Sequence, residues 1–349
     1  MNYHISSVEL LKRHPLAISR DVRAGSMNLF LAMTLGNQVG FGEAVPDHEQ
    51  GQTVDKATCQ LDTFLKTNNI DELAVQTIWQ QGKEAGLIAP VQAALDMALW
   101  DLLAKKAQLP CYKLFGLTKK KLATSVTIGI MSPQQAAERT SKLLQNNCLS
   151  TLKIKLGSPQ GIEADQAMFI EIKKIADKHG VKLRVDANGG WTLPKAKLML
   201  TWLAERGVEY VEQPLNVGHE EQLLELYRKR PLPIFVDESC HFSHDIPALA
   251  ESIDGINIKL MKCGGFTEAL RLIATARAYG LKTMIGCMSE SSLAISAACS
   301  IAPLVDYIDL DSHLNIKNDP ATGSVMDKQG NLLISDDYGH GGQLHDNII

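Results

Sequence analysis

The feature that most constrains the fold is a regular alternation of short apolar segments with amphipathic segments, which begins near residue 125. Eight strand-like segments start close to positions 125, 152, 183, 209, 234, 256, 283 and 307. The intervals contain residues with helical periodicity, for example over 163–178, 194–206 and 267–279. Eight strand-plus-helix units at this period predict an α/β protein with a TIM-like barrel. A doubly wound sheet is the alternative, but it normally carries a glycine-rich phosphate loop, and no GxGxxG or GxxxxGK(S/T) pattern occurs.

The part of the chain that precedes this alternation is organised differently. It contains two short strand candidates joined by a turn, followed by two helix candidates, over 28–36, 39–43, 53–66 and 88–107. We therefore predict a small α+β capping domain over residues 1–120, completed by the polar, glycine-rich tail 313–349, and a barrel over 121–312.

Composition excludes several classes of partner. The 349 residues include 35 Lys and Arg against 39 Asp and Glu, for a net charge of −4, so the chain has no bulk attraction to nucleic acid or to an anionic membrane. No apolar stretch is long enough to span a bilayer, and no secretory signal is evident at the N-terminus. Seven scattered cysteines without a CxxC pair are typical of reduced thiols, so we expect a cytoplasmic protein.

Three acidic residues stand at the ends of consecutive predicted strands. Asp186, Glu212 and Asp237 are separated by 26 and 25 residues. The carboxyl ends of barrel strands meet at one face, where three acids would repel one another unless a cation neutralised them. Carboxylate oxygens favour Mg²⁺, with Mn²⁺ as the second choice. The alternative is that each acid caps a helix or pairs with a lysine.

Two lysines lie on opposite sides of the same predicted face. Strand alternation directs Lys153 and Lys155 into the barrel from the second strand, and Lys259 comes from the sixth. A second lysine nearby and a bound cation would both lower the pKa of Lys155, which would let it act as a base near neutral pH. Lys155 and Lys259 then form a base–acid pair on either side of one substrate carbon. The alternative is that these lysines only form salt bridges with the three acids.

Motifs along nearly the whole chain resemble the enolase superfamily, and within it the muconate-lactonizing-enzyme subgroup. They are GFGEAVP at 40–46, DMALWDLLAKK at 96–106, TLKIKLG at 151–157, RVDANGGW at 184–191, VEQPL at 211–215, VDES at 236–239 and NIKLMKCGG at 257–265. The resemblance implies a capping domain over a modified (β/α)7β barrel. It also implies abstraction of a proton α to a carboxylate.

The resemblance assigns roles to residues that match the motifs. It implies that the three acids bind Mg²⁺, that Lys155 and Lys259 exchange the proton, and that Lys153 assists them. Asn188 and Glu238 are expected to support the metal ligands, and Thr127 and Cys287 to contact the substrate.

A pair of acids at the end of the eighth predicted strand distinguishes between the activities found in this subgroup. Asp309-x-Asp311 resembles the DxD of dipeptide epimerases, where it binds the substrate ammonium, and IGCMSESS at 285–292 is similar to their seventh-strand segment. These two acids argue against a cycloisomerase that acts on a dicarboxylate, because they would repel its substrate. The prediction is therefore a dipeptide epimerase, in which the C-terminal residue of the substrate changes configuration.

The expected substrate is L-Ala-D/L-Glu, which suits recycling of peptidoglycan peptides, with Arg20 reading the acidic side chain. Arg23 is the alternative for that role, and hydrophobic or cationic dipeptides remain open. An N-acylamino-acid racemase or o-succinylbenzoate synthase is the nearer rival, and a barrel that binds metal without catalysis is the farther one. A homo-oligomer is compatible with the sequence.

Overall fold

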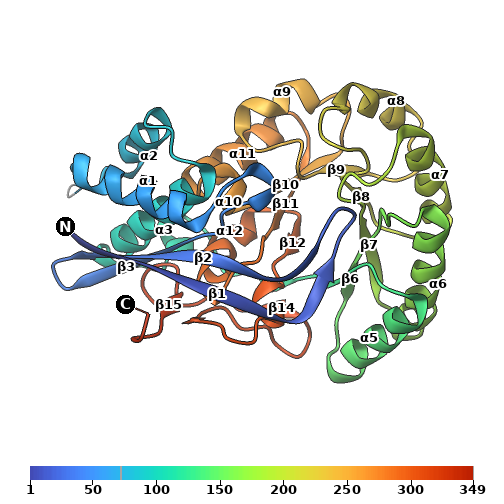
Figure 1. Cartoon of the computed structure of the whole chain (residues 1–349), viewed down its shortest axis with the longest axis horizontal. Coiled ribbons are helices and arrows are strands. Elements are labelled where there is room, and N and C mark those ends of the chain that lie inside the picture. The colour runs from blue at the N-terminus through green and yellow to red at the C-terminus, as the bar shows by residue number, and fades with distance from the viewer. Residues whose placement is uncertain (71–72, 349) are drawn as a thin grey trace.

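The computed structural model describes residues 1–70 and 73–348 and contains two parts (Figure 1). The N-terminal part is a three-stranded antiparallel sheet in the order β1-β2-β3, formed by Asn2–Ala17, Val22–Leu35 and Gln38–Ala44. The helices α1 (Val54–Thr67), α2 (Val75–Glu84) and α3 (Ala89–Lys106) belong to the same part. This arrangement confirms the predicted α+β cap.

Both faces of the central strand β2 are buried over residues 28–33. Leu29 and Leu31 pack with Leu61 and Leu95 of the helices, whereas Phe30 on the opposite face packs with residues from the barrel and the C-terminal tail. Because successive strand residues point to opposite faces, one strand can join the cap to the rest of the molecule.

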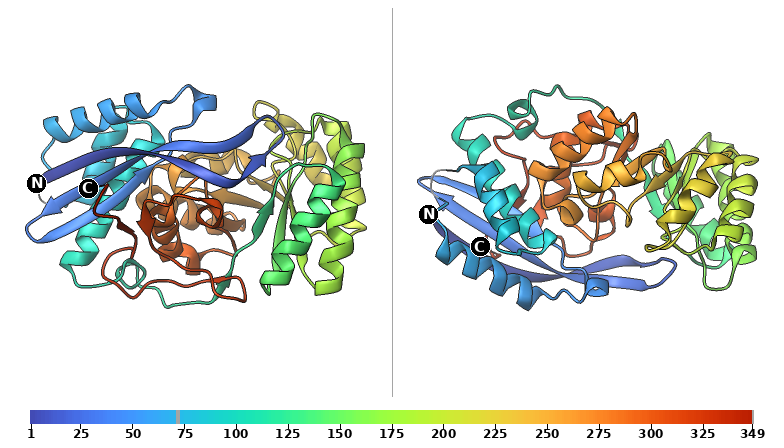
Figure 2. Two further views of the ribbon diagram at one scale, coloured as in Figure 1. Left: turned by 60° about the horizontal axis from the view of Figure 1, so that its bottom comes forward. Right: turned by 90° about the horizontal axis from the view of Figure 1, so that it is seen from above.

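The first strand is a feature that the sequence did not predict. β1 has few apolar residues that alternate, and only Leu10 and Lys12 of its side chains are fully buried. The predicted strand at 28–36 also begins earlier, at Val22, because β1 pairs with β2 as far as Ala17 and Val22. The β1–β2 hairpin extends from the cap toward the green part of the barrel (Figure 2).

The second part is the predicted barrel. Eight parallel strands follow one another in sequence order from β5 to β12. They are Val126–Ile128, Thr151–Lys155, Lys182–Asp186, Val211–Glu212, Ile234–Val236, Gly255–Ile258, Lys282–Gly286 and Tyr307–Asp309. The backbone N–H of Ser125 donates to the Ile308 carbonyl at 3.3 Å, which brings the first and last strands together.

Helices cover the outside of these strands (Figure 1). They are α5 (Pro133–Asn146), α6 (Ile162–His179), α7 (Leu193–Ala204), α8 (Leu223–Arg228), α9 (Ile246–Leu249), α11 (Phe266–Ala278) and α12 (Ser292–Ile301). Two single-turn helices, α4 (Cys111–Leu114) and α10 (Leu260–Cys263), and the 3₁₀ helix η5 (Ser312–Asn315) complete the set used below. No α-helix in the described ranges has the length and apolar character needed to cross a bilayer.

The C-terminal tail returns to the cap. The short strands β13 (Ala321–Thr322) and β15 (Gln343–Leu344) pair with each other, and β14 (Asn331–Leu332) pairs with β4 (Leu122–Ala123). The backbone N–H of His340 donates to Asp101 of α3 at 2.9 Å. The tail therefore links the cap to the barrel.

Candidate active site

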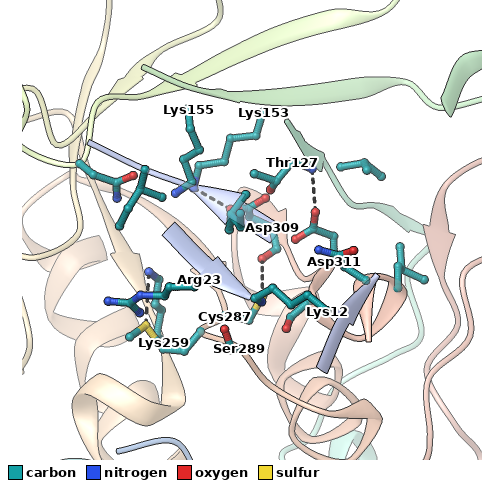
Figure 3. A pocket seen from close by; sticks show the side chains of 18 of the residues that line it. Lys12, Arg23, Thr127, Lys153, Lys155, Lys259, Cys287, Ser289, Asp309 and Asp311 are labelled. Atoms are coloured by element: carbon teal, nitrogen blue, oxygen red, sulfur yellow. Dashed lines mark hydrogen bonds and ion pairs between the residues drawn. The ribbon is translucent and has the colours of Figure 1, made fainter. Parts of the chain in front are cut away.

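A cavity of about 370 Å³ lies between the carboxyl ends of the barrel strands and the β1–β2 hairpin (Figure 3). The residues that line it include Lys153, Lys155, Lys259, Asp309 and Asp311, which the sequence placed at strand ends. Barrel enzymes carry their active sites on this face, because loops at the carboxyl ends of different strands converge there.

The three acids of the predicted metal site are buried beside the cavity. Asp186 ends β7, Glu212 ends β8, and Asp237 follows β9 directly. The exposed fraction of each residue is 1% or less. Buried carboxylates require compensating charge or hydrogen bonds, and the neighbouring lysines supply part of it.

Each predicted lysine contacts one or more of these acids. Lys155 Nζ lies 2.6 Å from Asp186 Oδ2, and Lys259 Nζ lies 2.6 Å from Asp237 Oδ2. Lys153 Nζ lies 3.2 Å from Asp186 and 2.8 Å from Glu212. Lys155 and Lys259 enter from opposite walls of the cavity (Figure 3), since three strands separate β6 from β10.

The acids differ in how strongly the lysines compensate their burial. Burial opposes ionisation of Asp186, but Lys155 and Lys153 outweigh it and lower its pKa to about 2. The pKa of Asp237 is also lowered, because Lys259 and Lys262 overcome the effect of burial. Burial and the nearby Asp186 raise the pKa of Glu212 to about 7. Glu212 is thus the acid whose charge most needs a further cation.

The donor atoms of this cluster suit a hard cation. Glu212 Oε2 and Asp237 Oδ1 are buried and accept no hydrogen bond, although lysine ammonium groups lie 2.8 and 2.5 Å away. Asn188 Oδ1 and Glu238 Oε2, close to the same acids, are also buried without a hydrogen-bond donor. Carboxylate and amide oxygens of this kind are ligands for Mg²⁺. Among the described residues, no three acidic, histidine or cysteine side chains already surround a common point; the three acids contact lysines instead.

Asn188 and Glu238 connect the acids to the hairpin. The Asn188 amide donates to Glu238 Oε1 at 3.2 Å and its backbone N–H donates to Asp186 Oδ1 at 2.8 Å. Arg20 donates to Glu238 at 2.9 Å, to the Asn188 carbonyl at 2.8 Å and to Glu49 at 2.6 Å. The Arg20 guanidinium lines the cavity with these acceptors around it, so reading a substrate carboxylate would require one of these contacts to break.

Arg23, the alternative to Arg20, also lines the cavity. Its guanidinium lies 2.5 Å from Glu49 and 3.1 Å from Asp21. Neither arginine therefore presents an uncompensated charge to the cavity.

The two acids of the DxD motif differ from each other. Asp309 ends β12, where its carboxylate lies 2.6 Å from Lys153 Nζ and accepts a hydrogen bond from Ser125 Oγ at 2.5 Å. Asp309 therefore already has a protein cation, Lys153, beside it. Asp311 lies beyond the strand, in the residue that precedes η5, and Thr127 N–H donates to its Oδ2 at 2.6 Å. Removal from solvent and the nearby Asp309 raise the pKa of Asp311 to about 6.

The remaining predicted contact residues lie at the same end of the cavity. Thr127 belongs to β5 and Cys287 follows β11, and both line the cavity. The Cys287 thiol donates to the Asp309 carbonyl at 3.3 Å, and burial raises the pKa of this thiol well above its usual value. Cys287 is therefore a neutral wall residue.

Sequence reasoning missed four cations in the cavity wall: Lys12 and Arg13 of β1, Arg139 of α5 and Lys262 of α10. Lys262 contacts Asp237, and its ammonium also donates to the Cys240 and Asn257 carbonyls at 3.1 Å. The NIKLMK motif, with Lys262 three residues after Lys259, was an available signal. Lys12, Arg13 and Arg139 had no such signal, because they stand in segments of ordinary mixed polarity.

Comparison with known proteins gives the family. A model described as "Enolase C-terminal domain-like" matches residues 135–348. A second, described as "Mandelate racemase / muconate lactonizing enzyme, N-terminal domain", matches residues 4–116. The chain belongs to the enolase superfamily. Its two matched segments correspond to the barrel with its tail and to the cap.

Several relatives of this chain are named epimerases. A hydrophobic dipeptide epimerase from Roseobacter litoralis is 52% identical over 99% of this chain and 98% of its own length. An L-Ala-D/L-Glu epimerase from Bacteroides thetaiotaomicron is 34% identical over 94% and 84%. The solved structure of a dipeptide epimerase from Enterococcus faecalis, complexed with Mg and L-Leu-L-Tyr, is 29% identical, covers 98% of this chain and 99% of its own, and superposes with a TM-score of 0.92.

Proposed function

We propose that this enolase-superfamily member is a dipeptide epimerase that inverts the α-carbon of the C-terminal residue. The observation that carries the proposal is the placement of Lys155 and Lys259 on opposite walls of one cavity that also holds Asp311 (Figure 3). The strands β7, β8 and β9, which bring in the three buried acids, lie between the strands of the two lysines. The full-length similarity to named dipeptide epimerases supports it. Two opposed lysines suit a reaction in which one face of a carbon loses a proton and the other gains one.

Asp186, Glu212 and Asp237 would hold Mg²⁺, which supplies Lewis-acid polarisation of the substrate's terminal carboxylate. Lys155 and Lys259 then face opposite sides of the α-carbon. The lysine that is neutral removes the α-proton, and the protonated lysine returns a proton to the other face. Lys153, whose pKa is raised well above its usual value by Asp309, Glu212 and Asp186 against the effect of burial, stays charged and compensates the acids.

At the other end, the carboxylate of Asp311 binds the substrate ammonium. This places the peptide across the cavity, with its carboxylate toward the three acids and its amine toward η5. Asp309 positions Lys153 through their 2.6 Å contact and Thr127 positions Asp311 through its backbone N–H.

For the epimerised residue we propose an apolar side chain. Arg20 is surrounded by Glu49, Glu238 and the Asn188 carbonyl, whereas Leu16 and Ile18 of the same hairpin offer apolar wall surface. The 52% identity to a hydrophobic dipeptide epimerase supports this choice. L-Ala-D/L-Glu is the second candidate substrate, because Arg20 lines the cavity. A role in recycling peptidoglycan peptides is proposed only for this second substrate.

We propose a reducing, cytoplasmic location because of the state of the cysteines. All seven are free thiols, and Cys59 and Cys148 are exposed. Exposed free thiols persist where the environment keeps them reduced.

The test is a screen of an L-Ala-L-Xaa library in D₂O with Mg²⁺, read by mass spectrometry. Exchange of one α-proton together with formation of the D epimer at Xaa supports epimerisation. Faster exchange in N-acylamino acids than in the dipeptides would instead favour a racemase. Absence of exchange in every compound would favour a barrel that binds metal without catalysis.

A further inference from the structure

Two buried or half-buried cations in the cavity wall have no hydrogen-bonded or ion-paired partner among the described residues. The side chains of Lys12 and Arg139 line the cavity, yet neither forms a hydrogen bond, ion pair or ring contact with any residue in the described ranges. Lys12 is only 7% exposed, and burial lowers its pKa. A buried ammonium without a partner is costly, so its retention points to a ligand that supplies the missing anion.

Both cations flank the acid that is proposed to bind the substrate amine. Lys12 and Arg139 both experience the charge of Asp311. β1 reaches η5 because Lys12 pairs with Ile316 in an isolated β-bridge. Figure 3 shows Lys12, Cys287 and Asp311 at the same part of the cavity.

The wall around this group is partly apolar. Leu143 of α5, Leu314 of η5 and Met326 of the tail line the cavity together with the two cations. A bound group here would therefore meet an acid, two cations and a short apolar surface. An amino acid with a free ammonium, a short aliphatic chain and a terminal carboxylate has the complementary pattern.

We propose that Lys12, with Arg139, is a specificity-determining residue that binds the side-chain carboxylate of an acidic amino-terminal residue, so that the preferred substrates are L-Glu-Xaa or L-Asp-Xaa dipeptides. The inference rests on the proposed epimerase function and adds the chemistry of the residue that is not epimerised. Asp311 binds its ammonium, and the two cations bind its carboxylate. The apolar C-terminal side chain proposed above occupies the other end.

The test compares L-Glu-L-Leu with L-Gln-L-Leu, which differ only in a carboxylate and an amide. We expect wild-type kcat/KM for α-deuterium exchange to be at least about tenfold higher for L-Glu-L-Leu, since a charge-assisted contact exceeds a neutral one. Lys12→Met should bring this ratio close to one, and Lys12→Arg should retain it. Lys317→Met is the matched control, because it removes an exposed charge beside β1 that does not line the cavity, and it should keep the wild-type ratio.

A wild-type ratio near one would overturn the inference without any variant, so it stays testable if Lys12→Met does not fold. A ratio that survives in folded Lys12→Met and Arg139→Gln would also overturn it. An increase in kcat/KM for every dipeptide in Lys12→Met would show that Lys12 opposes the ammonium, which contradicts the proposal. Exchange of L-Ala-L-Leu by the wild-type enzyme is the separate readout: its absence counts against the epimerase function, whereas its presence with a Glu/Gln ratio near one counts only against this inference.

Discussion

The two ends of the cavity differ in whether their basic side chains form ion pairs. At the end where the strands β6 to β10 meet, Lys153, Lys155 and Lys259 each lie within 2.8 Å of an acid. At the end near η5, Lys12 and Arg139 have no partner among the described residues. Fixed ion pairs hold side chains in the geometry that proton transfer requires, whereas unpaired charges are available to a ligand. The comparison separates the part of the site that we propose to react, the reacting end, from the part that we propose to select the substrate, the selecting end.

The largest effect is expected from the paired end. Glu212→Gln removes one charge at nearly constant volume, so the fold should persist while Mg²⁺ binding weakens and activity falls at least about a thousandfold, because Lewis-acid polarisation contributes several kcal/mol. Calorimetric Mg²⁺ titration and turnover measure both effects. Glu251→Gln, on the exposed surface, is the control. Full activity after exhaustive chelation would refute the metal assignment.

The lysines should show that the paired end has two chemically distinct faces. We expect Lys155→Ala and Lys259→Ala each to lower epimerisation by about 10²–10⁴-fold, which is the usual contribution of a general acid or base. Each variant should still exchange the α-proton of one substrate epimer, and the retained epimer should differ between them. Proton NMR in D₂O with both epimers measures this. Exchange of the same substrate epimer by both variants would contradict a two-base mechanism.

Asp311 should show that the η5 end contributes binding. Asp311→Asn should lower kcat/KM for L-Ala-L-Leu by about ten- to a hundredfold, the range expected for loss of a charged hydrogen bond of about 1.5–3 kcal/mol. The pKa of Asp311 is raised to about 6. Its carboxylate is therefore present above this pH, and wild-type kcat/KM should fall as the pH drops through it.

The pH dependence has its own control. In Asp311→Asn, kcat/KM should no longer fall near pH 6, because the amide does not titrate. Asp55→Asn, on an exposed helix turn, should keep it. If kcat/KM of Asp311→Asn fell with pH as it does in the wild type, the pH dependence would belong to another group.

The smallest effects concern stability and compare an unpaired lysine with a paired one. Lys105 Nζ lies 2.7 Å from buried Asp101, so Lys105→Met should lower the free energy of unfolding by about 3 kcal/mol, because it leaves a buried charge uncompensated. Lys12→Met removes an unpartnered charge and should raise it by about 1 kcal/mol. Urea unfolding measures both. Destabilisation by Lys12→Met equal to that of Lys105→Met would contradict the distinction between the two lysines.

The sequence predicted the reacting end of the site better than the selecting end. Asp186, Glu212 and Asp237 could be placed together because parallel barrel strands repeat at a regular period and end at one face. The 2.6 Å contact of Lys153 with Asp309 could not be predicted, since the two residues are 156 positions apart and meet only when the barrel brings β6 and β12 together.

The unpaired cations were beyond sequence reasoning for a different physical reason. β1 lacks an apolar run, and its burial depends on pairing with β2 and on the bridge between Lys12 and Ile316. Such long-range backbone pairing leaves no local pattern around Lys12. Arg139 is likewise one polar residue of an amphipathic helix, α5, whose cavity-facing side is known only once the tail is in place.

The most direct test of the account is a comparison of L-Ala-L-Leu with N-acetyl-L-Ala-L-Leu in D₂O with Mg²⁺. The two substrates share every group at the reacting end and differ only in the ammonium at the η5 end. The account predicts inversion at the leucine α-carbon in both, with kcat/KM about ten- to a hundredfold lower for the acetylated peptide. Equal or faster reaction of the acetylated peptide would contradict the proposed function, because it would show that the substrate ammonium contributes nothing to binding at Asp311.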